Sequence, residues 1–180
     1  MITPSATEIS KMICEELGYK NFVFCLDLTD NARARAEEYS FKENYLLEFD
    51  DWHIITKDGS KGYKYVYALI LEDGVVAVVG KTTFQVKGTK ISGYNDLFRA
   101  YKGKELTAQL IAAHYKINID GNGGSKQVDM KVKKAVIIPV NTDGLEGKTY
   151  DDRTKELEKR IGNLLVSKQI FILNGASHLH

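Results

Sequence analysis

Residues 62–83 of this 180-residue chain hold the side chains whose types and spacing could do chemistry. Tyr63, Tyr65 and Tyr67 alternate along one apolar run, so they share one face of the strand that this run predicts. The next apolar run ends abruptly in Gly80-Lys81-Thr82-Thr83, a small residue followed by a cation and two hydroxyl groups. Phenols on one strand and a Gly-Lys-Thr exit on the next indicate a functional site.

The Gly-Lys-Thr triplet invites comparison with the nucleotide-binding P-loop. That loop needs a glycine, four residues and then Gly-Lys-Ser/Thr, because its backbone amides wrap the phosphates. Here five residues separate Gly74 from Gly80, and all five are alanine or valine, typical of a strand. Asp73-Gly74 instead predicts the tight turn of a β-hairpin that joins strands near 63–72 and 75–80. A P-loop ATPase or GTPase is therefore a minor hypothesis.

The same hairpin resembles the core of the GIY-YIG nucleases. In that family one strand carries Gly-Ile-Tyr and the next carries Tyr-Ile-Gly. Tyr65-Val66-Tyr67 and Val78-Val79-Gly80 stand at these two places, with the expected ten residues between them. A late helix that bears Glu158, followed by Asn174, continues the family's order. The resemblance covers roughly residues 62–175 and is closest to the compact restriction and phage members.

The resemblance implies a metal-dependent endonuclease that hydrolyses double-stranded DNA, with Mg²⁺ or Mn²⁺ held by Glu158. Tyr67 would orient or deprotonate the attacking water, and Arg99 would clamp the phosphate through its planar guanidinium. Lys81 would add positive charge beside the phosphate. Further residues, which would contact the DNA or support the site, are Tyr65, Gly80, Lys87, Lys90 and Asn174. Many such enzymes cut as homodimers, so a homodimer is also expected.

One departure from the family keeps a second function open. Val78 stands where the second motif has its tyrosine, and valine can neither donate nor accept a hydrogen bond through its side chain. Lys81 or Tyr65 could take over that role. Otherwise the chain would be a catalytically weak or inactive module of the same fold that binds nucleic acid or a protein.

The predicted elements favour an α/β (α+β) fold, and the resemblance implies a small three-stranded antiparallel sheet flanked by helices. We expect residues 1–60 to form an N-terminal α/β elaboration, which could recognise the target or a partner, and the resemblance implies that 61–180 form a GIY-YIG-like catalytic domain. We expect these elements: a helix at 5–18, a strand at 21–28, the hairpin, a basic loop at 84–93, a helix at 95–116, a loop at 120–125, a strand at 128–140 and a helix at 151–168.

Charge and composition are compatible with a nucleic-acid partner. Residues 81–134 carry 11 basic and 4 acidic side chains, although the whole chain has a formal net charge of only +1. Cys14 and Cys25 are far apart and lack metal-site spacing. No apolar run approaches the roughly 18 residues that a membrane span needs. We therefore expect a cytoplasmic protein with no membrane contact.

Overall fold

The computed structural model describes residues 3–18, 24–27, 53–54, 61–87, 90–92, 106–140 and 148–175. The helices in these ranges are α1 (Ala6–Leu17), α4 (Leu106–Tyr115), α5 (Gly124–Lys131) and α6 (Lys148–Ser167). The strands are β1 (Phe24–Asp27), β2 (His53–Ile54), β3 (Lys61–Leu71), β4 (Val76–Lys87), β5 (Lys90–Ser92) and β6 (Val132–Pro139).

The strands form one antiparallel sheet in the order β1-β6-β3-β4-β5, and β2 pairs with β3 beside this path. The three long strands β6, β3 and β4 make up its centre, and β1, β2 and β5 are short additions. The mixture of helices with an antiparallel sheet confirms the predicted α+β class. The kinship with GIY-YIG nucleases stays a prediction.

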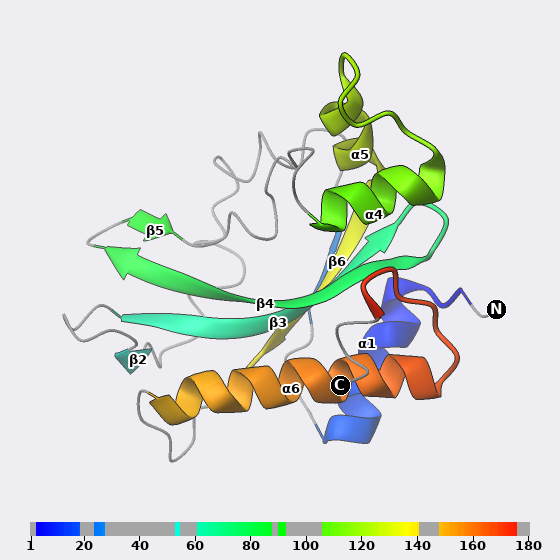
Figure 1. Cartoon of the computed structure of the whole chain (residues 1–180). Helices are drawn as coiled ribbons and strands as arrows, with labels where there is room; N and C mark the ends of the chain where they lie inside the picture. The colour runs from blue at the N-terminus through cyan, green and yellow to red at the C-terminus, as the bar shows by residue number, and fades with distance from the viewer. Residues whose placement is uncertain are drawn as a thin grey trace.

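Helices cover both faces of the sheet (Figure 1). On one face, α1 and α6 bury a cluster that includes Ile9, Val66 and Ile161. On the other face, α4 and α5 bury a second cluster that includes Leu69, Ile111 and Val128. Successive residues of a strand point to opposite faces, so these two clusters divide each central strand between them. The faces are called the α6 face and the α4 face below.

The N-terminal helix follows its sequence signals. Ser5 accepts a hydrogen bond from the Glu8 backbone N–H, and the Glu8 carboxylate accepts one from the Ser5 N–H, which makes a capping box. Gly18 ends the helix with φ at 68°, a left-handed conformation that suits glycine. Because α1 packs on the sheet and β1 pairs with β6, these parts of the predicted elaboration share the sheet and core of the later residues.

Two predicted boundaries are wrong. The residues expected in a loop at 84–93 are strands where the structure describes them: 84–87 continue β4, which pairs with β3 and β5 there, and Lys90–Ser92 form β5. Residues 124–131, expected to run from a loop into a strand, form α5, and β6 begins only at Val132. The helix expected at 95–116 is described only from Leu106 to Tyr115. Among the described residues, no helix combines the length and apolar character that a membrane crossing needs.

Candidate functional site

Tyr67 and Gly80 face each other across the central hairpin. They are cross-strand partners in β3 and β4, and the phenol of Tyr67 lies across Gly80 on the α4 face. A β-carbon placed on Gly80 would lie 2.8 Å from both Cζ and Oη of Tyr67. The absence of a side chain at Gly80 therefore makes room for the phenol ring. Tyr67 itself is half-buried, so part of its surface is open to solvent.

Lys81 and Glu158 meet on the opposite side of the sheet. Lys81 pairs with Val66, which belongs to the α6 face, and its Nζ lies 3.0 Å from Oε2 of Glu158 on α6. The side chains are 42% and 21% exposed, so solvent screens this ion pair in part. The pair ties α6 to β4 while leaving its charges accessible from outside.

A second set of contacts anchors the start of α6 to β3. Lys64 forms an ion pair with Asp151, and its backbone N–H donates a 2.7 Å hydrogen bond to the buried Tyr150 hydroxyl. Asp151 and Glu158 are seven residues apart, about two helical turns, so they lie on the same side of α6. These contacts fix which side of the helix faces the sheet, and they thereby place Glu158 beside Lys81.

Asn174 lies at the outer edge of β4. Its Oδ1 accepts a hydrogen bond from the Val79 N–H, and its Nδ2 donates one to the Val79 carbonyl, both at 3.2 Å. The Leu173 N–H donates to the Val76 carbonyl at 2.9 Å, and Ile172 forms a parallel bridge with Val76. The segment after α6 thus runs along the edge of β4, and the Asn174 amide pairs with its backbone.

Five predicted site residues therefore gather around three consecutive positions of β4, Val79 to Lys81. They approach from three directions: Tyr67 from the α4 face, Glu158 from the α6 face and Asn174 from the strand edge. Gly80 and Lys81 belong to the strand itself. Since β4 stands between Tyr67 and Glu158, a phosphate could contact both only at the edge of the strand.

The other predicted residues divide into two groups. Tyr65 is 1% exposed and packs in the core of the α4 face. Its expected role as a substitute for the missing tyrosine stays a prediction. Val78 is likewise buried in that core. Arg99 lies outside the described residues, and Lys87 and Lys90 are described only as backbone positions in β4 and β5.

Glu158 offers oxygen ligands of the kind that Mg²⁺ prefers. Mg²⁺ in phosphoryl-transfer sites is often bound by one or two carboxylates together with substrate phosphate and water. In the structure this carboxylate is paired with Lys81. Within the ranges that the structure describes, no three His, Cys, Asp or Glu side chains group so that they could hold a metal on their own.

A polar cluster at the β3–β4 turn has no counterpart in the sequence expectations. His114 Nε2 lies 2.6 Å from Asp73 Oδ2, and the Val75 N–H donates to Asp73 Oδ1. Burial raises the pKa of Asp73, but the hydrogen bonds from His114 and from the Val75 N–H outweigh it, and the net pKa is lowered. Burial and the nearby Asp73 carboxylate raise the pKa of the Tyr115 phenol. Residues 73 and 114 are too distant in sequence for a local pattern to indicate this contact.

Comparison with protein-family models, curated proteins and solved structures found no match to this chain.

Proposed function

We propose that this chain is a GIY-YIG-like, metal-dependent endonuclease that binds double-stranded DNA at the edge of β4 and hydrolyses a phosphodiester bond there. The observation that supports this proposal is the convergence of Tyr67, Glu158 and Asn174 on Val79 to Lys81. A cytoplasmic location and a restriction-type or phage-type role belong to the same proposal.

Each residue has a role that suits its position. A phosphate at the β4 edge would attract Lys81, whose ammonium now neutralises Glu158. That exchange would free the Glu158 carboxylate for Mg²⁺ or Mn²⁺, which would supply Lewis-acid stabilisation of the phosphate oxygens. The phenol of Tyr67 would orient the attacking water from the α4 face. Arg99 and Lys81 would stabilise the negative charge of the transition state.

A second candidate function is a DNA-binding module of the same fold that does not cleave. Two observations favour it: β4 separates Tyr67 from Glu158, and Val78, at the place of the missing tyrosine, is buried. In this case Lys81 and neighbouring lysines would contact the DNA backbone, and affinity would fall steeply with salt.

Binding and cleavage of the same DNA separate the two functions. Plasmid and short duplexes are incubated with the full chain and Mg²⁺, Mn²⁺ or EDTA, and both retention on a gel and strand breaks are scored. Arg99→Ala and Lys81→Ala should reduce both DNA binding and DNA cleavage. Glu158→Gln should abolish cleavage but leave DNA binding intact. Glu156→Gln is the matched control, because Glu156 is exposed on the same helix. DNA binding without cleavage under either metal would favour the second function. If the chain neither binds nor cleaves DNA, both candidate functions are contradicted.

A further inference from the structure

Two Asn-Gly dipeptides occur in this chain, Asn122-Gly123 and Asn174-Gly175. Asparagine followed by glycine can close a five-membered ring, in which the backbone nitrogen of the glycine attacks Cγ of the asparagine side chain. Glycine favours this step because it has no β-carbon to obstruct the approach. Both dipeptides carry the same reactive groups, so their surroundings in the fold decide which of them reacts.

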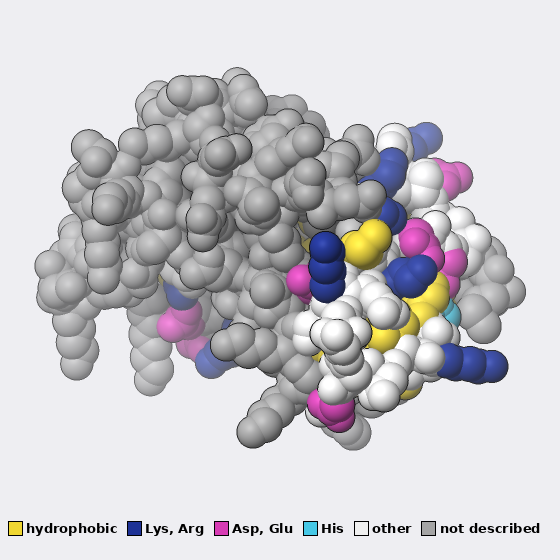
Figure 2. All heavy atoms as spheres, turned by 90° about the horizontal axis from the view of Figure 1, so that it is seen from above, with side chains coloured by type: hydrophobic (Ala, Val, Ile, Leu, Met, Phe, Trp, Pro, Cys, Tyr) yellow, Lys and Arg dark blue, Asp and Glu magenta, His cyan; other side chains and the backbone are white. Residues whose placement is uncertain are grey.

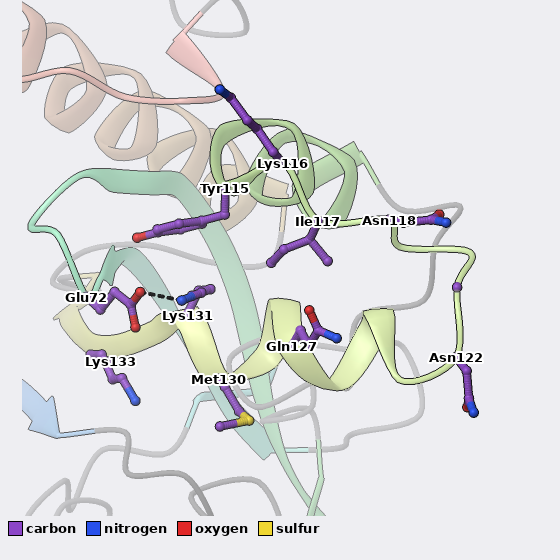
Figure 3. A pocket seen from close by; sticks show the side chains of 11 residues that line it. Glu72, Tyr115, Lys116, Ile117, Asn118, Asn122, Gln127, Met130, Lys131 and Lys133 are labelled. Carbon is purple, nitrogen blue, oxygen red and sulfur yellow. Dashed lines mark hydrogen bonds and ion pairs between the residues drawn. The ribbon is translucent and has the colours of Figure 1, made fainter.

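Asn122 stands in an open part of the loop between α4 and α5. Its side chain is exposed, and Figure 3 shows it pointing outward from the chain just before α5 begins. A β-carbon on Gly123 would meet no atom within 4 Å, so the space around the attacking nitrogen is open. Figure 2 views this end of the molecule from above and shows uncharged polar side chains and backbone, in white, over much of its described surface. Water therefore reaches the Asn122-Gly123 dipeptide.

Hydrogen bonds hold the loop on either side of this dipeptide. The Gly121 N–H donates to the Asn118 carbonyl at 3.1 Å, and the Gly124 N–H donates to the Gly121 carbonyl at 3.0 Å. Among the described residues, none accepts a hydrogen bond from the Gly123 N–H or pairs with the Asn122 amide. The Gly123 nitrogen can therefore lose its proton, and the Asn122 side chain can turn toward it, without first breaking a contact of the fold.

Asn174-Gly175 carries the same groups in a protected setting. Oδ1 and Nδ2 of Asn174 are both bonded to the Val79 backbone at 3.2 Å, and the Gly175 N–H donates to the Ile172 carbonyl at 3.1 Å. Ring closure here requires the amide to leave β4 and the Gly175 N–H to lose its partner, so it must wait for a local opening of the structure. The fold thus leaves Asn122 reactive and shields Asn174.

We propose that Asn122 is a site of spontaneous deamidation. The Gly123 nitrogen forms a bond to Cγ of Asn122, the bond from Cγ to Nδ2 breaks, and the proton that the Gly123 nitrogen gives up leaves with Nδ2 as ammonia. The succinimide ring that results takes up one water molecule, which opens it at either carbonyl to give aspartate or isoaspartate. No oxidant or reductant takes part. Each event replaces a neutral side chain by a carboxylate and lowers the formal net charge from +1 to zero.

The new carboxylate would lie at the start of α5. Gly123 is the N-cap of this helix, so no side chain caps it, and its first turn contains no acidic residue. Negative charge is favourable beside the backbone N–H groups and the positive end of the helix dipole. The fold should therefore accept the aspartate product, whereas isoaspartate adds a methylene group to the main chain in front of the helix.

The test incubates the full chain with EDTA at mildly alkaline pH and maps the products by mass spectrometry of its peptides. The Asn122 peptide should yield both isoaspartate and aspartate, and a form with the charge of Asn122→Asp should appear on isoelectric focusing. Conversion of Asn174 in the same sample should be at least about tenfold slower, because it requires local opening. In guanidinium chloride, which unfolds the chain, the two sites should react at similar rates. Asn122→Gln is the matched control and should form little acidic product, since its longer side chain closes a ring less readily.

Three results would overturn the proposal. The first is equal conversion of Asn122 and Asn174 in the folded chain, and the second is an intact Asn122 after the unfolded chain has reacted. The third is aspartate without isoaspartate, because direct hydrolysis of the amide gives only aspartate. Circular dichroism checks that Asn122→Gln leaves the fold intact. The test uses neither DNA nor a divalent metal, so its result is independent of the proposed endonuclease.

Discussion

Gly80→Ala should destabilise the protein through a single contact with Tyr67. The added β-carbon would lie 2.8 Å from Cζ and Oη of Tyr67, whereas carbon atoms in contact normally stand about 3.5–4.0 Å apart. Overpacking of this kind costs about 1–3 kcal/mol, and replacing glycine by alanine in a strand returns about 0.5–1 kcal/mol. We expect a net loss of about 0.5–2 kcal/mol in the free energy of unfolding.

A double-mutant cycle with Tyr67→Ala isolates that contact. Without the phenol, Gly80→Ala should stabilise the chain by about 0.5–1 kcal/mol, so the coupling energy should be about 1–3 kcal/mol. Urea denaturation followed by circular dichroism measures all four proteins. Gly175→Ala is the control, because its β-carbon would meet only Ile172 Cβ at an ordinary 3.9 Å. An equal effect of Gly80→Ala with and without the phenol would refute the proposed packing.

Three further predictions test the surroundings of the site. Gln169 has a left-handed φ of 61° at the end of α6, so Gln169→Gly should raise the free energy of unfolding by about 0.5–1 kcal/mol in urea denaturation. Asn174→Ala removes two hydrogen bonds to the Val79 backbone and should lower that free energy by about 1–3 kcal/mol in the same assay. The lowered pKa of Asp73 stabilises the folded state above the ordinary carboxyl pKa, so the stability advantage over Asp73→Asn should shrink as pH falls below about 4 in acid titrations.

Each of these three predictions can be contradicted by a specific result. Asn163→Gly, inside α6, should lower the free energy of unfolding by a few tenths of a kcal/mol, and a stability change of the same sign for Asn163→Gly and Gln169→Gly would mean that Gln169 is not left-handed. Unchanged stability in Asn174→Ala would mean that its amide does not pair with β4. If the stability advantage of wild type over Asp73→Asn grows as the pH falls, the pKa of Asp73 is raised in the folded state and not lowered.

Local signals predicted some elements well and others not at all. The helix expected at 5–18 agrees with α1, because the interactions that end this helix, the Ser5–Glu8 capping box and the left-handed Gly18, are local in sequence. Lys116 and Gln169 adopt the left-handed conformation after α4 and α6. A glycine at these positions would have indicated the end of each helix in the sequence, whereas lysine and glutamine do not. Helix α5 escaped notice because glycine disfavours helices, yet the close packing of Gly124 on the preceding loop requires a residue without a side chain.

The sequence indicated which residues belong to the candidate site, but not how they are arranged in space. The hairpin register implies that Tyr67 and Gly80 share a face and that Lys81 points to the other, since strand side chains alternate. The sequence does not reveal which face α6 covers, and this decides where Glu158 lies. Contacts between distant residues, such as Lys64 with Asp151, settle it.

The most direct test of the central claim is metal-dependent cleavage of a DNA duplex by the wild-type chain and by Glu158→Gln and Tyr67→Phe. If the edge of β4 is the active site, wild type cleaves with Mg²⁺ or Mn²⁺ and both variants lose at least about 100-fold in rate, as expected for loss of a metal ligand or of a general base. Cleavage by Glu158→Gln at the wild-type rate and the same metal concentration would contradict the account.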